Sequence, residues 1–459
     1  MKPCFTQVRD RQPIDIHVLT KSNYAAWLAE QNEHDQNWLA ATGFSVDNPK
    51  AALMPEETGK LLKVIYVVEH MDSLWQLAGL SAQLPPGVFE LKGLTKKQYE
   101  LAACAWGLAV YKFTRYKATK NTASAILFLP LELDVAAIDR ELDATYLVRD
   151  LINTPAEHMG PADLALAADK ISLQFGATIK HIKGDDLIKE GFPAIHAVGR
   201  GSKKAPQLID MVWGNPEHPK ITLVGKGVCF DSGGLDLKSA SNMRLMKKDM
   251  GGAAHVLGLA YWIMSSQLPI RLRVIIGAAE NMISGDAYRP GDVVSTRKGL
   301  TVEIGNTDAE GRVVLSDCLA LACEDNPEVI IDFATLTGAG KVGLGPDVPS
   351  LFSNCDEFAK ELERLSLHRD DPLWHMPLYK PYRDYIDSSI ADLSNDSSSP
   401  FAGAITAALF LNEFVNPEIT WAHLDIMAWN VKARPGRPEG GEAMGLRTAY
   451  EYILSMTII

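Results

Sequence analysis

Short apolar runs separated by helix-like segments set the pattern of the chain. In the first 130 residues, "LKVIYVVEH" (62–70) and "SAILFLP" (124–130) are apolar and partly β-branched, which predicts buried strands. Between them, residues 96–117 have the spacing of one long helix. The first part of the chain is therefore predicted to alternate strands and helices.

The alternation becomes more regular further along the chain. The predicted core strands are "AIHAVGRG", "QLIDMVW", "ITLVGKG", "RLRVIIGAAE", "EVIIDFATLT" and "WAHLDIM". Helix candidates lie between them, including 249–266 and 311–325. Strands that alternate with helices favour a largely parallel sheet covered on both faces. In such sheets, ligands bind beyond the carboxyl ends of the strands.

A helix-like segment at 134–154 connects the two regions and places a domain boundary near residue 140. The predicted fold class is α/β. A smaller N-terminal α/β domain (1–140) precedes a larger C-terminal domain (141–459), whose mostly parallel sheet is flanked by helices. Two stretches rich in Gly, Ser and Pro, 393–403 and 432–445, are predicted to be loops.

Composition and charge narrow the classes of function. The formal net charge of -12 and the lack of a long basic run argue against a nucleic-acid partner. The six cysteines are scattered, which fits a reducing cytosol. No apolar run reaches the roughly 18 residues of a membrane span, and the N-terminus lacks a signal-peptide core. We expect a soluble, cytoplasmic protein with no membrane partner.

The first cluster of candidate chemistry follows the strand "ITLV". Lys226, Asp231, Lys238 and Asp249 lie there among glycines. The Gly-Lys-Gly turn suggests a phosphate loop, but the GxxxxGK[ST] frame is absent. Each residue alone could be a surface lysine or a turn residue, and Asp249 could cap a helix. As a group at the end of a buried strand, they predict a site.

The second cluster is "NTDAEGR", in which Asp308 and Glu310 stand two residues apart and Arg312 follows. Carboxylates that converge repel each other, and one takes up a proton unless a cation is present. Asp231 and Asp249 would bring the total to four negative charges, against one lysine and one arginine. The charge count therefore predicts divalent metal ions.

The predicted ligand set is rich in oxygen. The chain has no HExxH motif and no Cys/His ligand spacing, and His255 is predicted to be a helix-face residue rather than a ligand. Carboxylate sites suit Mg and Mn, and also Zn in a two-metal cluster. A two-metal cluster activates a bridging water, so the chemistry expected here is hydrolysis.

These motifs resemble those of the leucyl (cytosol) aminopeptidase family of two-metal exopeptidases. The matching segments are "NTDAEGR", "VGKGVCFDSGG", "KKDMGGAA", "ENMISGDAYRPGDV" and "DFATLTGA", with "YKFTRYK" and "RDLINTPAEHMGP" upstream. The resemblance covers roughly residues 100–459 and leaves the first ~95 residues outside it. It implies that the larger domain is a catalytic metallo-aminopeptidase domain. Such an enzyme hydrolyses the N-terminal residue, leucine-like or of broad range, from peptides through a metal-bridging water.

The resemblance also assigns roles within the site. It implies two divalent ions, Mn or Zn, held by Lys226, Asp231, Asp249, Asp308 and Glu310. Asp231 and Glu310 would bridge both ions, and Lys226 would have to be neutral, its pKa lowered by burial and by the ions. Lys238 would polarise the scissile carbonyl. Arg312 would hold a bicarbonate that acts as general base.

The remaining implications concern specificity and assembly. Met246, Asn306, Thr335 and Gly338 match family positions that line the pocket for the first side chain, although Met246 and Thr335 could also be ordinary packing. The family forms homohexamers, built as a dimer of trimers. Two alternatives stay open: another two-metal hydrolase of a small amide or ester, and a nucleic-acid-binding regulator, which the acidic charge opposes.

Overall fold

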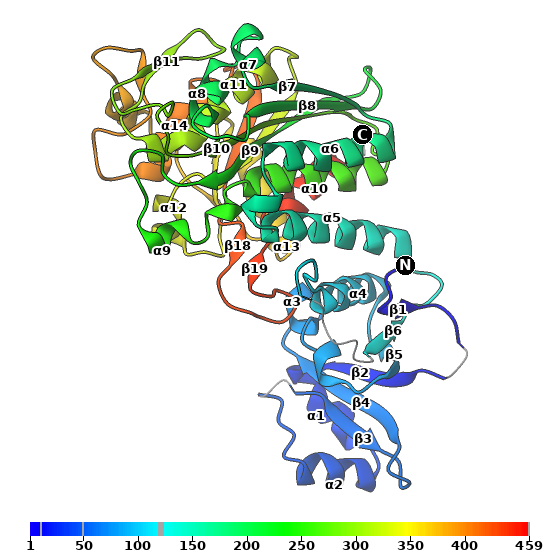
Figure 1. Cartoon of the computed structure of the whole chain (residues 1–459). Coiled ribbons are helices and arrows are strands. Elements are labelled where there is room, and N and C mark those ends of the chain that lie inside the picture. Colours follow the sequence, from blue (N-terminus) through cyan, green and yellow to red (C-terminus); the bar gives the residue numbers. More distant parts are fainter. Residues whose placement is uncertain (10–11, 48–49, 118–123, 458–459) are drawn as a thin grey trace. The chain divides into compact units, whose positions relative to one another are not determined.

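The computed structural model describes residues 1–9, 12–47, 50–117 and 124–457. The chain forms two compact units, coloured along the sequence in Figure 1. The smaller unit comprises Met1–Asp143 together with Lys432–Glu439, and the larger comprises Ala144–Val431 together with Gly440–Ile459. The division falls inside helix α5 (Val135–Asn153). The return of a late segment to the smaller unit has no signature in the hydrophobic pattern.

The smaller unit is built on a six-stranded sheet with the order β1-β6-β5-β2-β4-β3. Its strands are β1 (Phe5–Thr6), β2 (Ile14–Thr20), β3 (Ala52–Pro55), β4 (Leu61–Val68), β5 (Gly87–Lys92) and β6 (Ala125–Phe128). All neighbours are parallel except β3 and β4. Its helices are α1 (Lys21–Ala29), α2 (Glu33–Ala41), α3 (Leu74–Leu77) and α4 (Lys96–Val110). The strands predicted at 62–70 and 124–130 are confirmed as β4 and β6.

Helix α4 is shorter than predicted. It begins at a capping box in which Thr95 and Gln98 each bond the other's backbone N–H. The prediction extended it to residue 117, but Tyr111 leaves the helical region with φ -56° and ψ 134°. The apolar spacing continues past the point where the backbone turns, so periodicity alone overestimates the length.

The larger unit contains an eight-stranded sheet with the order β15-β14-β17-β13-β9-β10-β8-β7. Its strands are β7 (Thr178–Lys183), β8 (Gln207–Trp213), β9 (Lys220–Asp231), β10 (Arg271–Asn281), β13 (Val329–Ala334), β14 (Ser350–Ser353), β15 (Trp374–His375) and β17 (Thr420–Asp425). The four central strands, β17 to β10, run parallel. Strands β8 and β7 add in antiparallel fashion at one edge, and β14 is antiparallel to β17 at the other.

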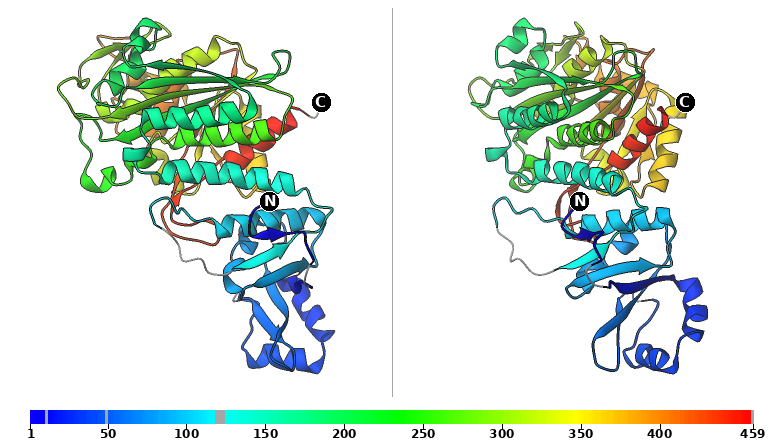
Figure 2. Two further views of the ribbon diagram at one scale, coloured as in Figure 1. Left: turned by 45° about the vertical axis from the view of Figure 1, so that its right-hand side comes forward. Right: turned by 90° about the vertical axis from the view of Figure 1, so that its right-hand side faces the viewer.

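Helices cover both faces of this sheet, as two views in Figure 2 show. One hydrophobic layer holds side chains of α5, α6 (Pro161–Phe175), α10 (Gly251–Ser265), α13 (Asp356–His368) and α15 (Leu446–Ser455). The other layer holds side chains of α8 (Pro193–Gly199), α11 (Glu310–Cys323) and α14 (Gly403–Asn412). Successive residues of β13 alternate between the layers, with Ile330 in one and Ile331 in the other. The predicted α/β class with a mostly parallel, helix-flanked sheet is confirmed.

Five of the six predicted core strands are confirmed as β8, β9, β10, β13 and β17, but "AIHAVGRG" is helix α8 rather than a strand. Pro193 occupies the first turn of α8, where its missing N–H costs nothing. The Asp317 carboxylate accepts hydrogen bonds from the N–H groups of Ala194 (2.9 Å) and Ile195 (3.1 Å). A short apolar run does not distinguish a buried strand from a buried helix, and the capping group is far away in sequence.

Close backbone approach brings α10 against the central strands. A Cβ on Gly252 would lie 2.0 Å from the Phe333 carbonyl oxygen and 2.8 Å from the Lys226 nitrogen. Only glycine permits this approach, which sets the start of α10 beside the inner part of β9. In the part of the chain that the structure describes, none of the helices combines the length and hydropathy that crossing a bilayer requires.

Candidate active site

A cavity of about 390 Å³ lies in the larger unit, beyond the carboxyl ends of the central strands. It is lined by β9, the loops after β9 and β13, the turn η3 (Met246–Lys248), and the starts of α11 and α12 (Ala339–Leu344). Its charged lining residues are Lys226, Asp231, Lys238, Lys248, Asp249, Asp308, Glu310 and Lys341. All five predicted metal ligands and Lys238 therefore meet in one cavity.

Lys226 joins two of the acids at the buried end of the cavity. Its Nζ lies 2.8 Å from Asp249 Oδ2 and 2.8 Å from Glu310 Oε1, and it donates to the Thr335 carbonyl oxygen at 3.0 Å. A Cβ on Gly311 would come within 2.6 Å of Lys226 Cε, so this glycine lets α11 approach the lysine. Asp249 and Glu310 are almost fully buried, at 3% and 1% exposure.

Lys238 joins the other two acids. Its Nζ lies 2.8 Å from Asp231 Oδ2 and also contacts Asp308 Oδ1. The second oxygen of Asp231 accepts hydrogen bonds from Asn281 Nδ2 and the Gly233 N–H, each at 2.9 Å. Asp231 is thus held from one side by neutral donors, and its other oxygen faces the cavity's cations.

The donor set fits divalent metal ions. Asp231, Asp308 and Glu310 each offer one oxygen, and the three oxygens lie within 4.8 Å of one another. Three buried oxygens have no conventional hydrogen bond from the described residues, although lysine ammonium groups lie beside them: Asp249 Oδ2, Asp308 Oδ1 and Glu310 Oε1. Buried carboxylate oxygens of this kind are costly unless a cation takes them up. Several oxygens at this spacing are what a hard dication prefers.

Burial and the repulsion between neighbouring carboxylates shift the pKa values of the acids. Burial, followed by the charge of Asp231, raises the pKa of Glu310 well above its usual range. Burial and then Asp249 raise the pKa of Asp231 to about 6. Burial would also raise the pKa of Asp249, but Lys226, Lys248 and the hydrogen bond from Thr335 together outweigh it, and the pKa falls.

A lysine that binds a metal ion must be neutral, but with protein charges alone Lys226 is protonated. Burial works to lower its pKa, but Asp249, Glu310 and Asp231 together raise it above its ordinary value. The three acids therefore hold a proton on Lys226. A neutral Lys226 would need the additional positive charge of metal ions in the same cavity.

The charge count made from the sequence is corrected by the structure. That count set four acids against one lysine and one arginine, whereas four lysines line the cavity with the four acids. Lys226 and Lys238 pair with all four acids, and Arg312 pairs with none of them. Charge balance alone therefore does not demand a metal; the convergence of carboxylate oxygens carries that argument.

Arg312 and Asn306 do not line this cavity. Arg312 lies on α11 and is 9% exposed, and its buried Nε has no hydrogen-bond partner among the residues that the structure describes. Burial lowers its pKa, although Asp396 and Glu310 oppose the shift. Asn306 has a structural task, because its Oδ1 accepts a hydrogen bond from the Asp308 N–H at 2.8 Å.

The other three predicted pocket residues, Met246, Thr335 and Gly338, do line the cavity. Thr335 also has a supporting contact, since its Oγ1 donates to Asp249 Oδ1 at 2.7 Å. That hydrogen bond orients a predicted ligand from outside the cluster. Thr335 therefore both lines the cavity and positions a carboxylate.

Several residues that shape the site were not singled out from the sequence. Asn281 Nδ2 and Tyr288 Oη both donate to the Thr307 carbonyl oxygen, at 2.9 and 2.7 Å. Both lie within "ENMISGDAYRPGDV", which could have marked them. Asn395 accepts from the N–H groups of Gly305 and Asn306, from a loop some 90 positions later in the chain. Only the fold brings Asn395 to that turn.

His255 is buried on α10 and both of its ring nitrogens are occupied within the protein. Nδ1 lies 2.6 Å from the Gly251 carbonyl oxygen, and Nε2 accepts from the Met444 N–H at 2.9 Å. An acceptor at Nε2 requires the neutral ring with its proton on Nδ1. His255 therefore ties α10 to the C-terminal part of the chain.

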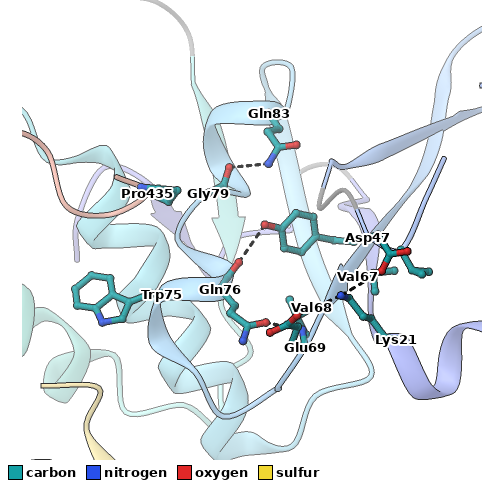
Figure 3. Close-up of a pocket in the computed structure, with 12 residues that line it drawn as sticks. Lys21, Asp47, Val67, Val68, Glu69, Trp75, Gln76, Gly79, Gln83 and Pro435 are labelled. Carbon is teal, nitrogen blue, oxygen red and sulfur yellow. Dashed lines mark hydrogen bonds and ion pairs between the residues drawn. The ribbon is translucent and has the colours of Figure 1, made fainter. Parts of the chain in front are cut away.

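A second cavity, of about 380 Å³, lies within the smaller unit (Figure 3). Its charged side chains neutralise one another: Lys21 Nζ lies 3.4 Å from Asp47 Oδ1 and 3.2 Å from Glu69 Oε1. All three side chains are largely exposed. This cavity brings together no buried acids comparable to those of the larger unit.

Comparison with known proteins supports a metal-dependent hydrolase site in the larger unit. Residues 146–450 match the cytosol aminopeptidase family, catalytic domain, and residues 14–130 match the M17 aminopeptidase, N-terminal domain. The N-terminal match extends the resemblance to a region that the motifs alone had left outside it. The solved structure of the cytosol aminopeptidase from Coxiella burnetii superposes with a TM-score of 0.95 and 49% identity, covering 99% of this chain and 100% of that one.

More distant relatives agree with this assignment. The probable cytosol aminopeptidase of Roseiflexus castenholzii is 44% identical over 316 residues, which span 68% of this chain and 64% of that relative. Peptidase B of Pectobacterium carotovorum is 39% identical over 80% of this chain and 87% of its own length. The bottromycin maturation enzyme BotP, solved in complex with Mn, has a TM-score of 0.86 and 30% identity over 97% of this chain.

The fold and the lysine–carboxylate cavity together define a metal-dependent aminopeptidase, an enzyme that releases residues from the N-terminus of peptides. Two findings identify the family: the catalytic-domain model matches most of the chain, and a solved cytosol aminopeptidase matches its full length. The chain belongs to the cytosol aminopeptidase family.

Proposed function

We propose that the chain acts through two divalent metal ions bound at the lysine–carboxylate cluster, on peptides with a free α-amine. The observation that carries this proposal is the convergence of Asp231, Asp308 and Glu310 within 4.8 Å in a cavity of substrate size. The Mn complex of BotP supports manganese as one candidate ion, and zinc is the other that the family resemblance implies.

The residues that would hold the ions are Lys226, Asp231, Asp249, Asp308 and Glu310. When bound, the ions would supply the hydrolytic water, polarise the scissile carbonyl and offer a position for the substrate's free amine. Asn281 and Thr335 keep Asp231 and Asp249 in place through the hydrogen bonds described above.

Lys238 is the proposed oxyanion partner. Burial opposes its charge, but Asp231 and Glu310 raise its pKa above the ordinary value, so it stays protonated. Its side chain keeps 12% exposure toward the cavity. Once its two acids are engaged by ions, the ammonium group can donate to the oxygen on which negative charge develops.

Arg312 is the proposed anchor of the proton acceptor. Within the described part of the chain its buried Nε has no hydrogen-bond partner, and a guanidinium presents donors that match a planar anion. Bicarbonate bound there would accept the proton of the attacking water. The partnerless Nε supports this role, because a buried donor without a partner is costly.

The pocket for the first side chain is proposed to include Met246, Thr335 and Gly338, with a leucine-like or broad range of residues. Asn306 would contribute by fixing the turn that carries Asp308. The family resemblance adds a cytoplasmic location and a homohexamer, whose sedimentation mass would be six times the 50.2 kDa of one chain. A mass near one chain would contradict the hexamer.

The test is hydrolysis of leucine p-nitroanilide by Mn- or Zn-loaded protein. Asp308→Ala removes one converging oxygen, so kcat/KM is expected to fall by at least about 100-fold. Asp356→Ala, at the exposed start of α13, is the matched control and should keep its activity.

The same assay separates the second candidate, a hydrolase of small amides or esters. N-acetyl-leucine p-nitroanilide lacks the free amine, so an aminopeptidase should not cleave it. Turnover of the blocked substrate at a rate similar to that of the free one would favour the second candidate.

A further inference from the structure

The loop that carries Lys238 is short, exposed and folded back on itself. It begins at Ser232, after β9, and the Lys238 N–H donates to the Ser232 carbonyl oxygen at 3.0 Å. Gly233 permits this fold, because its φ is +87° and a Cβ there would lie only 3.0 Å from the Lys238 nitrogen. Leu235 and Leu237 are exposed, at 43% and 56%. Apolar packing therefore does not fix the tip of the loop.

Hydrogen bonds to the neighbouring turn (305–309) hold the tip of this loop. The Oδ2 atom of Asp236 accepts from the Thr307 N–H at 2.7 Å, and the Asp236 N–H donates to Thr307 Oγ1 at 2.9 Å. Thr307 Oγ1 donates in turn to the Gly233 carbonyl oxygen at 2.6 Å. Thr307 is completely buried, and a Cβ on Gly234 would meet its Oγ1 at 2.9 Å. Asp236 is therefore the side chain that ties the tip of the loop to the turn.

The Asp236–Thr307 contact lies close in sequence to the catalytic groups. Thr307 directly precedes Asp308, whose Oδ1 contacts Lys238 Nζ, and Lys238 follows Asp236 by two residues. In this structure Asp231 and Asp308 hold the ammonium group. If these acids engage divalent ions, as the proposed function requires, their hold on Lys238 weakens. A lysine side chain is long and flexible, so its reach toward the substrate then depends on where the loop places its backbone.

The turn itself has supports that do not involve the loop. Asn281 Nδ2 and Tyr288 Oη donate to the Thr307 carbonyl oxygen, at 2.9 and 2.7 Å. Asn395 Oδ1 accepts from two N–H groups of the turn, at 2.8 and 3.2 Å. These three side chains come from other segments of the chain. Loss of Asp236 should therefore free the loop while the turn and its candidate metal ligand stay in place.

We propose that Asp236 positions Lys238 for catalysis by tying the loop after β9 to the turn that carries Asp308. Asp236 does not line the cavity, so it acts through Lys238 rather than on the substrate. The proposal rests on the proposed function, in which Lys238 donates to the oxygen that becomes negative. A displaced ammonium group would stabilise the transition state less, whereas the uncharged carbonyl of the bound substrate would lose little. The effect is therefore expected on kcat rather than on KM.

The first test measures hydrolysis of leucine p-nitroanilide by Mn-loaded protein. Asp236→Ala should lower kcat at least about 10-fold and leave KM within about twofold. Asp236→Asn should keep kcat within about threefold of the unmodified value, because its amide oxygen can still accept from the Thr307 N–H. Calorimetric titration with Mn alone should give the same Kd for both variants and the unmodified protein, within about twofold. Asp356→Ala, at the exposed start of α13, is the control and should match the unmodified protein.

A double-mutant cycle shows whether Asp236 acts through Lys238. The probe is the phosphonic acid analogue of leucine, whose tetrahedral anionic group resembles the transition state, and calorimetry measures its binding to Mn-loaded protein. Asp236→Ala should raise the Kd of this probe about 10-fold when Lys238 is present and less than about twofold in Lys238→Met.

Three outcomes overturn the proposal: an equal rise of the Kd with and without Lys238, a loss of Mn affinity in Asp236→Ala, or equal kcat values for Asp236→Ala and Asp236→Asn. Failure of the unmodified, Mn-loaded protein to cleave leucine p-nitroanilide would instead overturn the proposed function.

Discussion

At the scale of single residues, the same kinds of side chain serve chemistry in one place and structure in another. Asp308, in the turn before α11, carries a converging oxygen, whereas Asp317, on α11, does not line the cavity and accepts three backbone N–H bonds. His255 is as buried as any acid of the cluster and is bonded entirely within the fold. Burial and residue type therefore do not identify a functional residue without its partners.

His255 makes stability depend on pH. Burial lowers its pKa from 6.5 to about 4, although the bond to the Gly251 carbonyl opposes the shift. Above pH 6.5 the ring is neutral in both states; as the pH falls from 6.5 to 4, only the unfolded chain takes up a proton, so stability is lost. The loss between pH 7.5 and 5.0 should be about 2 kcal/mol of unfolding free energy.

Urea unfolding at the two pH values measures this loss. In His255→Gln the change between pH 7.5 and 5.0 should shrink by about the same 2 kcal/mol. His368→Gln, at the exposed end of α13, provides the control and should titrate like the unmodified protein. An unchanged pH dependence in His255→Gln would show that the ring does not control this window.

The candidate ligands were predictable at this scale because they are clustered in sequence. The "NTDAEGR" motif and the residues around Lys226 each place their chemistry within a few positions of a strand end or helix start. Lys248 and Lys341 could not be recognised in the same way. That both lysines line the cavity, and which acids there are already paired with other lysines, is visible only in the folded structure.

At the scale of helices and strands, the hydrophobic pattern predicts elements best where they lie in the core sheet. Strands β9, β10 and β13 follow their predicted segments because both faces of each are covered. The pattern fails at α8, where the deciding group is the carboxylate of Asp317 on α11. A cap supplied from a distant segment leaves no local trace in the sequence.

The cap on α8 should be measurable as stability. Asp317→Ala would leave the buried N–H groups of Ala194 and Ile195 and the partly buried N–H of Arg297 without acceptors, at a cost of roughly 3 kcal/mol or more. Chemical unfolding should show this loss. Asp186→Ala, on the exposed surface of α7 (Asp186–Lys189), should change stability by less than about 0.5 kcal/mol. Equal stability of the two variants would remove the carboxylate as the reason for the helix.

At the scale of the whole molecule, the order of the strands and helices determines where the candidate active site lies. The four parallel strands β17, β13, β9 and β10 end at one edge of the sheet, and the loops that follow β9 and β13 supply most of the cavity. The alternation of strands and helices predicted this placement. It did not predict that a segment after β18 (Trp429–Asn430) would rejoin the smaller unit.

Because residues 432–439 belong to the smaller unit, a single cut in the chain cannot separate the two units. Within the smaller unit, Pro435 lies against the position of a Gly79 Cβ at 3.4 Å, and the Arg437 guanidinium stacks 4.9 Å from the Trp75 ring. A truncation that discards residues 1–143 would therefore leave residues 432–439, which belong to the smaller unit, without their packing partners. A catalytic fragment without residues 1–143 would also need residues 432–439 removed and the chain rejoined there, because the larger unit consists of two separate segments of the sequence.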